Sequence, residues 1–235
     1  MDILKQKEKG NLVVISGPSG TGKGCIIKEV MNRNPNIWYS VSATSREIRP
    51  GEMEGVNYYY LSRDKFEKKI KTNFFLEYTE YNGNYYGTPK KYINDKLKQG
   101  KDVILEIEIN GALKIKELVK DAVFIFILPP SLKELINRLE KRGTESKDVI
   151  LNRFKSAYKE INEIKKYNYV VINDNLEDAI NKVDAIFKAE RCRVDRIEEI
   201  YLNTEEEVMH ELLIDYENIN NNPRNLWLKK GKSIV

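Results

Sequence analysis

The chain has 235 residues, of which 41% are hydrophobic and 32% charged, which is enough apolar material for a buried core. The 40 basic and 36 acidic residues leave a formal net charge of +4, which favours small anionic ligands over DNA or a membrane surface as partners. Two distant cysteines and a single histidine argue against a zinc site, a disulfide and histidine-based catalysis.

The first nine residues are polar, unlike a signal peptide, and no later apolar run approaches the length needed to span a membrane. We therefore expect a cytoplasmic protein without a membrane or nucleic-acid partner.

A glycine-rich loop follows the first apolar run, residues 12–15, and helix-forming residues 26–31 come directly after it. Its residues are Gly17, Pro18, Ser19, Gly20, Thr21, Gly22, Lys23, Gly24 and Cys25. Glycines let successive backbone N–H groups turn toward one anion, the next helix adds its positive end, and the lysine adds a full charge. The pattern predicts a binding loop for ATP.

Two loop positions carry separate expectations. A Ser or Thr commonly follows the lysine and binds Mg²⁺, but this chain has Gly24, so phosphates, water and a carboxylate must hold the metal. The Gly-Lys-Gly sequence favours a kinase of nucleoside monophosphates over a GTPase switch protein. We expect Cys25 to be a small buried residue of the first helix.

Short apolar runs then alternate with helical patterns. Strands are expected at residues 12–15, 103–107, 123–128 and 169–172, and helices at residues 113–118, 132–139 and 179–187. Alternating strands and helices predict an α/β fold, a P-loop NTPase core whose parallel sheet is flanked by helices. Ser131, after two prolines, is expected to cap a helix.

Two regions interrupt this alternation. Residues 37–88 are rich in Tyr, Gly, Asn and Arg and predict an inserted mixed-β subdomain. Residues 138–165 carry one apolar helical face and predict a helical lid. The core then comprises residues 10–36, 89–137 and 166–195, and residues 196–235 form a polar C-terminal extension of open role.

Two arginines lie three residues apart in the inserted region, Arg46 and Arg49, with tyrosines following them. Guanidinium groups bind phosphate oxygens through two parallel hydrogen bonds. The segment therefore predicts a second anion site, for a monophosphate.

Several motifs in one order resemble the guanylate kinase family over about residues 10–195. Besides the loop, they are Thr44-Ser45-Arg46 with Arg49-Pro50-Gly51-Glu52, Gly83-Asn84-Tyr85-Tyr86-Gly87-Thr88, Leu105 to Ala112, and Arg142-Gly143-Thr144-Glu145. The resemblance implies Mg²⁺-dependent phosphoryl transfer from ATP to GMP or dGMP, giving ADP and GDP. The protein would be a monomer or homodimer.

The resemblance assigns the GMP-binding residues. Glu77 matches the guanine-reading carboxylate, because one carboxylate accepts both N1–H and the N2 amino group, whereas adenine presents an acceptor. The remaining matches are Ser42 and Thr88 near guanine O6, Glu108 as a further acidic contact, and Arg46, Arg49, Tyr58 and Tyr86 at the phosphate, with Glu52 orienting Arg49. Tyr59, Tyr60 and Tyr85 are expected to pack or to lie on the surface.

The resemblance also assigns catalytic groups, which position both nucleotides and neutralise the transferring group. They are Lys23, Arg46 and three lid arginines, Arg138, Arg142 and Arg153. Glu106 is the candidate for a water-mediated metal contact, and Asn173 resembles an adenine-side contact.

Two other functions stay open. A scaffold-type module of this fold would bind phosphorylated peptides, and a related kinase would act on a phosphorylated sugar. Lys23 disfavours the first, and the base-reading set of Ser42, Glu77 and Thr88 disfavours the second.

Overall fold

The structure is a computed structural model that describes residues 10–81, 83–140, 147–193, 209 and 213–214. The chain divides into a compact unit, Lys9–Arg196, and a second unit made of Met1–Glu8 and Ile197–Val235. In the second unit the structure describes three helical, exposed residues, Met209, Leu213 and Ile214. No helix within the described residues has the length and hydropathy that crossing a bilayer requires.

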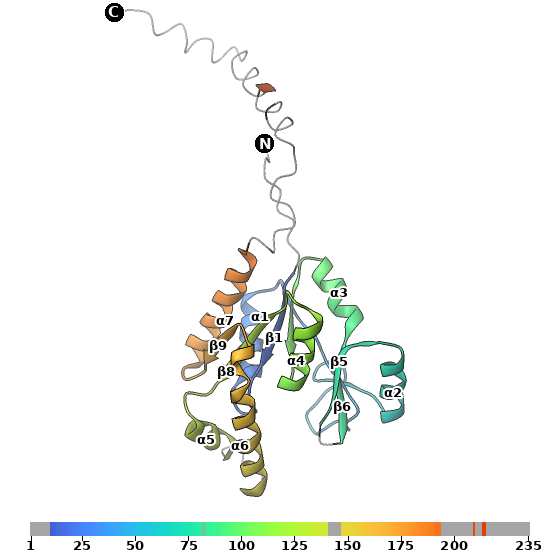
Figure 1. Cartoon of the computed structure of the whole chain (residues 1–235), viewed down its shortest axis with the longest axis vertical. Helices are drawn as coiled ribbons and strands as arrows, with labels where there is room; N and C mark the ends of the chain where they lie inside the picture. Colours follow the sequence, from blue (N-terminus) through green and yellow to red (C-terminus); the bar gives the residue numbers. More distant parts are fainter. Residues whose placement is uncertain (1–9, 82, 141–146, 194–208, 210–212, 215–235) are drawn as a thin grey trace, which may run out of the picture. The chain divides into compact units, whose positions relative to one another are not determined.

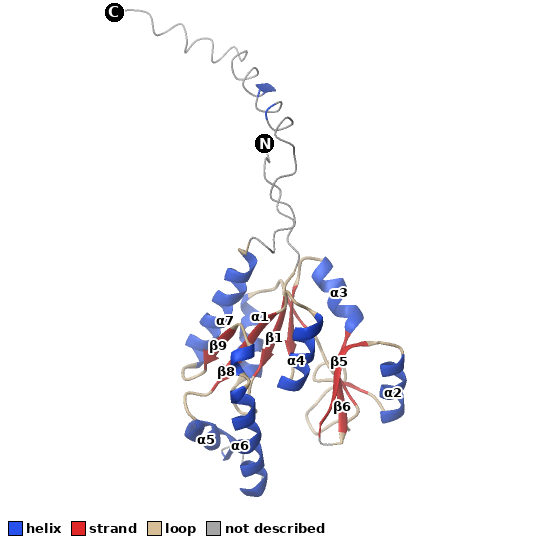
Figure 2. Cartoon of the chain, in the orientation of Figure 1, coloured by secondary structure: helices blue, strands red, loops and turns tan. Residues whose placement is uncertain are grey.

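A five-stranded sheet forms the centre of the larger unit (Figure 1 and Figure 2). Its strands, in spatial order, are β2 (Ile37–Tyr39), β7 (Asp102–Glu106), β1 (Leu12–Ser16), β8 (Val123–Leu128) and β9 (Tyr169–Ile172). All neighbouring strands are parallel. The three central strands are apolar almost throughout because both faces of a parallel sheet are covered.

Helices cover both faces of this sheet. On one face, α1 (Lys23–Arg33) and α7 (Leu176–Arg191) share an apolar cluster with the strands, which includes Ile27 and Val183. On the other face, α3 (Lys90–Lys98) and α4 (Ile109–Leu118) contribute to a second cluster. The predicted parallel sheet between two helical layers is confirmed.

A smaller mixed sheet lies beside this core (Figure 2). Its order is β4 (Tyr59–Tyr60), β3 (Ala43–Thr44), β6 (Asn84–Pro89) and β5 (Phe75–Tyr81), with α2 (Arg63–Lys71) packed on it. Phe66 of α2 is fully buried, and its ring stacks on those of Phe75 and Tyr85 at centroid distances of 4.4 and 5.3 Å. Tyr85 therefore packs, as the sequence predicted.

The predicted lid, residues 138–165, covers the end of α5 (Leu132–Glu140), whose first six residues were assigned to the core, and all of α6 (Lys147–Asn162). The 3₁₀ turn η1 (Ile164–Lys166) follows. Leu135, Leu139 and Ala157 form a small buried cluster between α5 and α6. The Ser131 hydroxyl accepts the backbone N–H of Glu134 at 3.0 Å, which confirms the predicted cap. Figure 1 shows this helix pair and the smaller sheet on either side of the carboxyl-terminal end of β1.

Two expectations about local structure are wrong. Residues 37–39 were assigned to the inserted subdomain, but they form β2, which pairs with β7 at an edge of the core sheet. Three residues with one buried side chain, Ile37, carry too little apolar pattern to mark a core strand. Cys25 is exposed, because the buried face of α1 is formed by the residues after it, Ile26, Ile27 and Val30.

Candidate active site

The glycine-rich loop joins the end of β1 to the start of α1. Gly22 is the N-cap residue with φ 85°, and no described side chain caps the helix, so its first N–H groups remain available to an anion. Gly17 has φ 145°, and a Cβ there would lie 2.2 Å from the carbonyl oxygen of Ile127. The Lys23 Nζ donates to the carbonyl oxygens of Gly17 and Pro18 at 2.6 and 3.1 Å, which holds the charge over the loop.

A buried amide supports this loop from β9. Asn173 follows the strand and is 5% exposed, and its Nδ2 donates to the carbonyl oxygen of Thr21 at 2.7 Å. Arg138 of α5 donates from Nη2 to the Asn173 carbonyl oxygen at 3.1 Å and pairs through Nε with Glu134 at 2.9 Å. The Asn173 side chain thus holds the loop backbone, and the adenine contact suggested by its sequence context stays a prediction.

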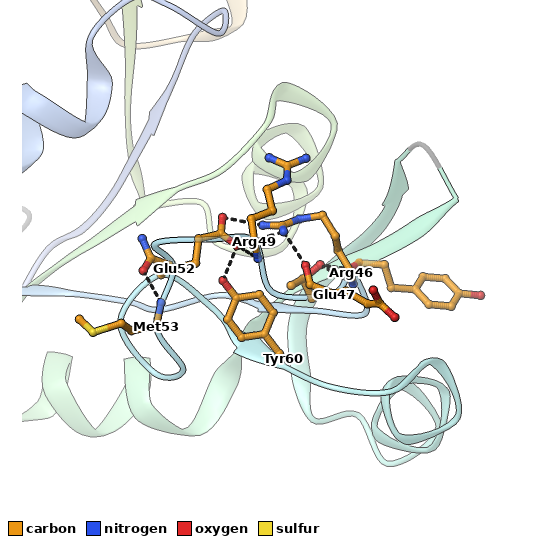
Figure 3. Close-up of polar contacts among 9 residues, drawn as sticks. Arg46, Glu47, Arg49, Glu52, Met53 and Tyr60 are labelled. Atoms are coloured by element: carbon orange, nitrogen blue, oxygen red, sulfur yellow. Dashed lines mark hydrogen bonds and ion pairs between the residues drawn. The ribbon is translucent and has the colours of Figure 1, made fainter. Parts of the chain in front are cut away.

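The two arginines of the second anion site are held differently (Figure 3). Arg46 donates from Nη2 to Glu52 Oε1 at 2.8 Å and from Nη1 to Glu52 Oε2 at 3.0 Å. Glu52 also accepts the backbone N–H of Arg49 at 2.9 Å, but the exposed Arg49 guanidinium extends away from it. The expectation that Glu52 orients the Arg49 side chain is therefore corrected: Glu52 fixes the Arg46 guanidinium and the Arg49 backbone.

The ion pair governs the titration of both partners. Hydrogen bonding to Arg46 lowers the pKa of Glu52 to about 2, and the same bond raises the pKa of Arg46. Glu52 therefore stays a charged carboxylate throughout the neutral pH range. Tyr60, which the sequence placed with packing or surface residues, donates its hydroxyl to Glu52 Oε2 at 2.8 Å and so belongs to this network.

Three tyrosines lie beside the Arg46 guanidinium. The centres of the Tyr58 and Tyr60 rings are 5.6 and 5.9 Å from its Cζ atom. Tyr86, whose ring centre is 5.9 Å from that of Tyr58, hydrogen-bonds the guanidinium. Burial raises the pKa of Tyr58 to about 12, so its hydroxyl remains a proton donor. The structure thus brings together Arg46, Tyr58 and Tyr86, three of the predicted phosphate ligands.

A buried carboxylate lies on β5. Glu77 is 6% exposed, and its Oε1 accepts the hydroxyl of Thr88 at 2.7 Å. Its Oε2 is buried without a hydrogen-bond partner among the described residues. Gly111 of α4 makes room for this oxygen, since a Cβ there would lie 2.9 Å from it. Burial raises the pKa of Glu77, and a buried acceptor of this kind fits a ligand that brings its own N–H donors.

Glu108 connects the two anion sites electrostatically. It directly precedes α4, and burial raises its pKa, while the Lys23 charge opposes that rise. The Glu108 charge in turn acts on both Glu77 and Tyr58. Glu108 is therefore within electrostatic range of both the loop lysine and two of the groups expected to bind GMP.

Glu160 of α6 was missed in the sequence. Burial raises its pKa to about 7, Lys23 opposes the rise and Glu108 adds to it, so this carboxylate is within electrostatic range of the loop lysine. A signal existed: Glu160 stands three residues after the buried Ala157, on the helix face expected to pack inward.

Several predicted residues have simpler surroundings. Glu106 ends β7 and accepts the hydroxyl of Tyr39 at 3.4 Å. Ser42 precedes β3, and its carbonyl oxygen accepts the N–H of Tyr59 at 2.8 Å. Gly24 has open space around it. Arg142 lies outside the described residues, as does the side chain of Arg153, whose backbone belongs to α6.

Comparison with known proteins decides the family. The sequence model described as guanylate kinase matches residues 9–190. The chain belongs to the guanylate kinase family.

Relatives within the family match over most of their length. A guanylate kinase from Clostridium tetani is 57% identical over 208 residues, which cover 88% of this chain and 100% of the relative. One from Clostridium acetobutylicum is 53% identical, covering 88% of this chain and 99% of the relative. The crystal structure of guanylate kinase from Anaplasma phagocytophilum superposes with a TM-score of 0.69 at 32% identity, covering 82% of this chain and 92% of that one. These matches agree with the P-loop α/β architecture.

Proposed function

We propose that the chain transfers the γ-phosphoryl group of ATP to GMP or dGMP, giving ADP and GDP. The observation that carries the choice of acceptor is the Glu77 carboxylate: its Oε1 accepts the Thr88 hydroxyl, and its buried Oε2 has no hydrogen-bond partner among the described residues. Guanine N1–H and its N2 amino group would give this carboxylate two donors, whereas adenine would oppose it with an acceptor. Family membership over residues 9–190 supports the same reaction.

The proposed reaction needs no covalent intermediate. Backbone N–H groups of residues 19–24 and the Lys23 ammonium bind the ATP phosphates, and Asn173 keeps the loop in shape. Arg46, Tyr58 and Tyr86, with Arg49, hold the GMP phosphate so that one of its oxygens attacks the γ-phosphorus in line. Glu77, Thr88, Ser42 and Glu108 bind the base, and Arg138, Arg142 and Arg153 act from the lid.

Mg²⁺ is the proposed cofactor, and it would neutralise charge on the β- and γ-phosphates. Within the described residues, no cluster of three or more His, Cys, Asp or Glu side chains surrounds a metal position. Gly24, which follows the lysine, has no hydroxyl to offer a metal and has open space around it. The loop therefore fits an ion that is held mainly by phosphates and water. Glu106 is the carboxylate proposed to contact it through water. A cytoplasmic location and a monomeric or homodimeric state stay predictions of the sequence.

A coupled assay with ATP and a panel of acceptors tests the function. GMP and dGMP should turn over, and kcat/KM for AMP should be lower by roughly 10⁴ because the buried Glu77 acceptor would be left unpaired. Ribose 5-phosphate should not react. Turnover of ribose 5-phosphate would indicate a sugar-phosphate kinase, and binding of a phosphopeptide without any turnover would indicate a scaffold module.

A further inference from the structure

Four hydrogen bonds converge on the Glu52 carboxylate (Figure 3). Oε1 accepts Nη2 of Arg46, and Oε2 accepts Nη1 of Arg46, the backbone N–H of Arg49 and the hydroxyl of Tyr60. The Tyr60 bond, at 2.8 Å, is the one that comes from β4, and the other donors belong to the loop that contains Glu52. Tyr60 therefore ties the carboxylate to the sheet.

The ion pair determines which edge of the Arg46 guanidinium is used. Of its five N–H donors, both on Nη1 are engaged, one with Glu52 and one with the Glu47 carbonyl oxygen at 2.6 Å. One Nη2 donor is engaged with Glu52. The bonds to Glu52 and Glu47 do not use Nε–H or the second Nη2 hydrogen, which share one edge of the guanidinium, the kind of edge that can bind two phosphate oxygens. The guanidinium also hydrogen-bonds the side chain of Tyr86, another residue expected to bind the phosphate.

Holding the arginine in advance improves phosphate binding. An Arg side chain loses conformational entropy when it is held in one rotamer. If the folded protein already holds the side chain, ligand binding does not have to supply that free energy. The side chains of Arg46 and Glu52 are 12% and 19% exposed, so their pair is partly shielded from water. With the pKa of Glu52 lowered to about 2, the carboxylate remains charged throughout the neutral range.

We propose that Tyr60 is a positioning residue for the phosphate of the acceptor nucleotide. Its hydroxyl fixes Glu52, and Glu52 fixes Arg46 with the Nε edge of the guanidinium presented to the phosphate. This inference rests on the proposed role of Arg46 in GMP binding. Tyr60 itself need not touch the nucleotide, because it acts on Arg46 through the Glu52 carboxylate and through its own contact with the guanidinium, whose Cζ atom is 5.9 Å from the centre of the Tyr60 ring.

Tyr60→Phe removes the hydroxyl and keeps the ring. The expected result is a three- to tenfold higher KM for GMP, about the effect of one lost hydrogen bond of ordinary strength. KM for dGMP should rise by the same factor because the phosphate is the same, and kcat and KM for ATP should stay within about twofold. The matched control is Tyr59→Phe on the opposite face of β4, where Tyr59 packs against the cluster of Ala43, Phe66 and Phe75. All its kinetic constants should stay within about twofold.

A double-mutant cycle separates positioning from a general structural effect. In a Glu52→Gln background, Tyr60→Phe should raise KM for GMP less than in the wild type, because the ion pair it supports is already lost. Equal effects in the two backgrounds would overturn the proposal, as would an unchanged KM for GMP in folded Tyr60→Phe protein. Arg46→Ala tests the underlying assignment by itself: if its KM for GMP is normal, Arg46 does not hold the phosphate and the proposal fails with it.

Discussion

The glycine-rich loop and the Arg46 cluster both present N–H donors to a phosphate, but they are built in different ways. The loop is one continuous segment between β1 and α1, and most of its donors are backbone groups placed by glycines such as Gly17 and Gly22. The Arg46 cluster uses side chains from the loop after β3, from β4 and from β6, held by hydrogen bonds to Glu52 and by ring contacts.

This difference determines how each site tolerates change. Backbone donors survive most substitutions, so the loop depends on the few positions where a Cβ would clash and on one charge, Lys23. The Arg46 cluster loses one donor or one support with each side chain removed. We therefore expect large effects of single residues at the loop lysine and graded, coupled effects around Glu52.

The largest expected effect is that of Lys23→Met, which removes the charge and keeps most of the side-chain length. The kcat should fall by roughly 10²- to 10³-fold, because a preorganised donor to the transferring group is lost. Steady-state kinetics with saturating ATP and GMP measure it. Lys28→Met, on an exposed position of the same helix, is the control and should be near wild type. A normal kcat in Lys23→Met would show that backbone donors alone suffice.

Glu77→Gln is expected to lower kcat/KM for GMP by roughly 10²-fold, because an amide cannot accept both guanine donors through one group. Glu80→Gln, an exposed position of the same strand, is the matched control. Equal activity of the two variants would refute the assignment of Glu77 to the base.

The same variant should gain stability at neutral pH. The folded pKa of Glu77 is raised by burial, so the native state binds more protons than the unfolded chain between the two pKa values. The free energy of unfolding of the wild type therefore falls as the pH rises from the unfolded to the folded pKa of Glu77. The Gln variant has no carboxyl group at this position, so its free energy of unfolding does not fall for this reason. In thermal denaturation, the Tm difference, variant minus wild type, should grow as the pH rises above the unfolded pKa of a glutamate, about 4. A difference that stays constant with pH would contradict the buried, ionising carboxylate.

The smallest of these effects is expected for Asn173→Ala. Loss of the 2.7 Å bond to the Thr21 carbonyl oxygen should loosen the loop and raise KM for ATP about five- to tenfold, with KM for GMP little changed. Asn181→Ala, at an exposed position of α7, is the control. If KM for GMP rose as much as KM for ATP, the amide would not act on the loop alone.

The sequence was most informative where structure is local. The runs at residues 12–15, 103–107 and 123–128 became central strands of the core sheet because buried parallel strands need continuous apolar residues. The run at residues 169–172 became an edge strand, in which Val171 is the buried residue. The three-residue strand β2 could not be assigned, since its place in the core depends on pairing with β7, which lies more than 60 residues later. Glu160 and Tyr60 were missed for the same reason: their partners come from other elements.

By itself the sequence determined the phosphate loop, the parallel α/β core and the family, because glycine spacing, strand composition and motif order are properties of neighbouring residues. The tertiary structure decided which carboxylate holds which arginine and where Asn173 directs its amide. It also decided that one oxygen of Glu77 is buried without a partner among the described residues. Asn173 and Thr21 are 152 residues apart, whereas Arg46 and Glu52 are six residues apart in one irregular loop. In both cases the burial and the hydrogen bonds are fixed only when the elements around them pack together.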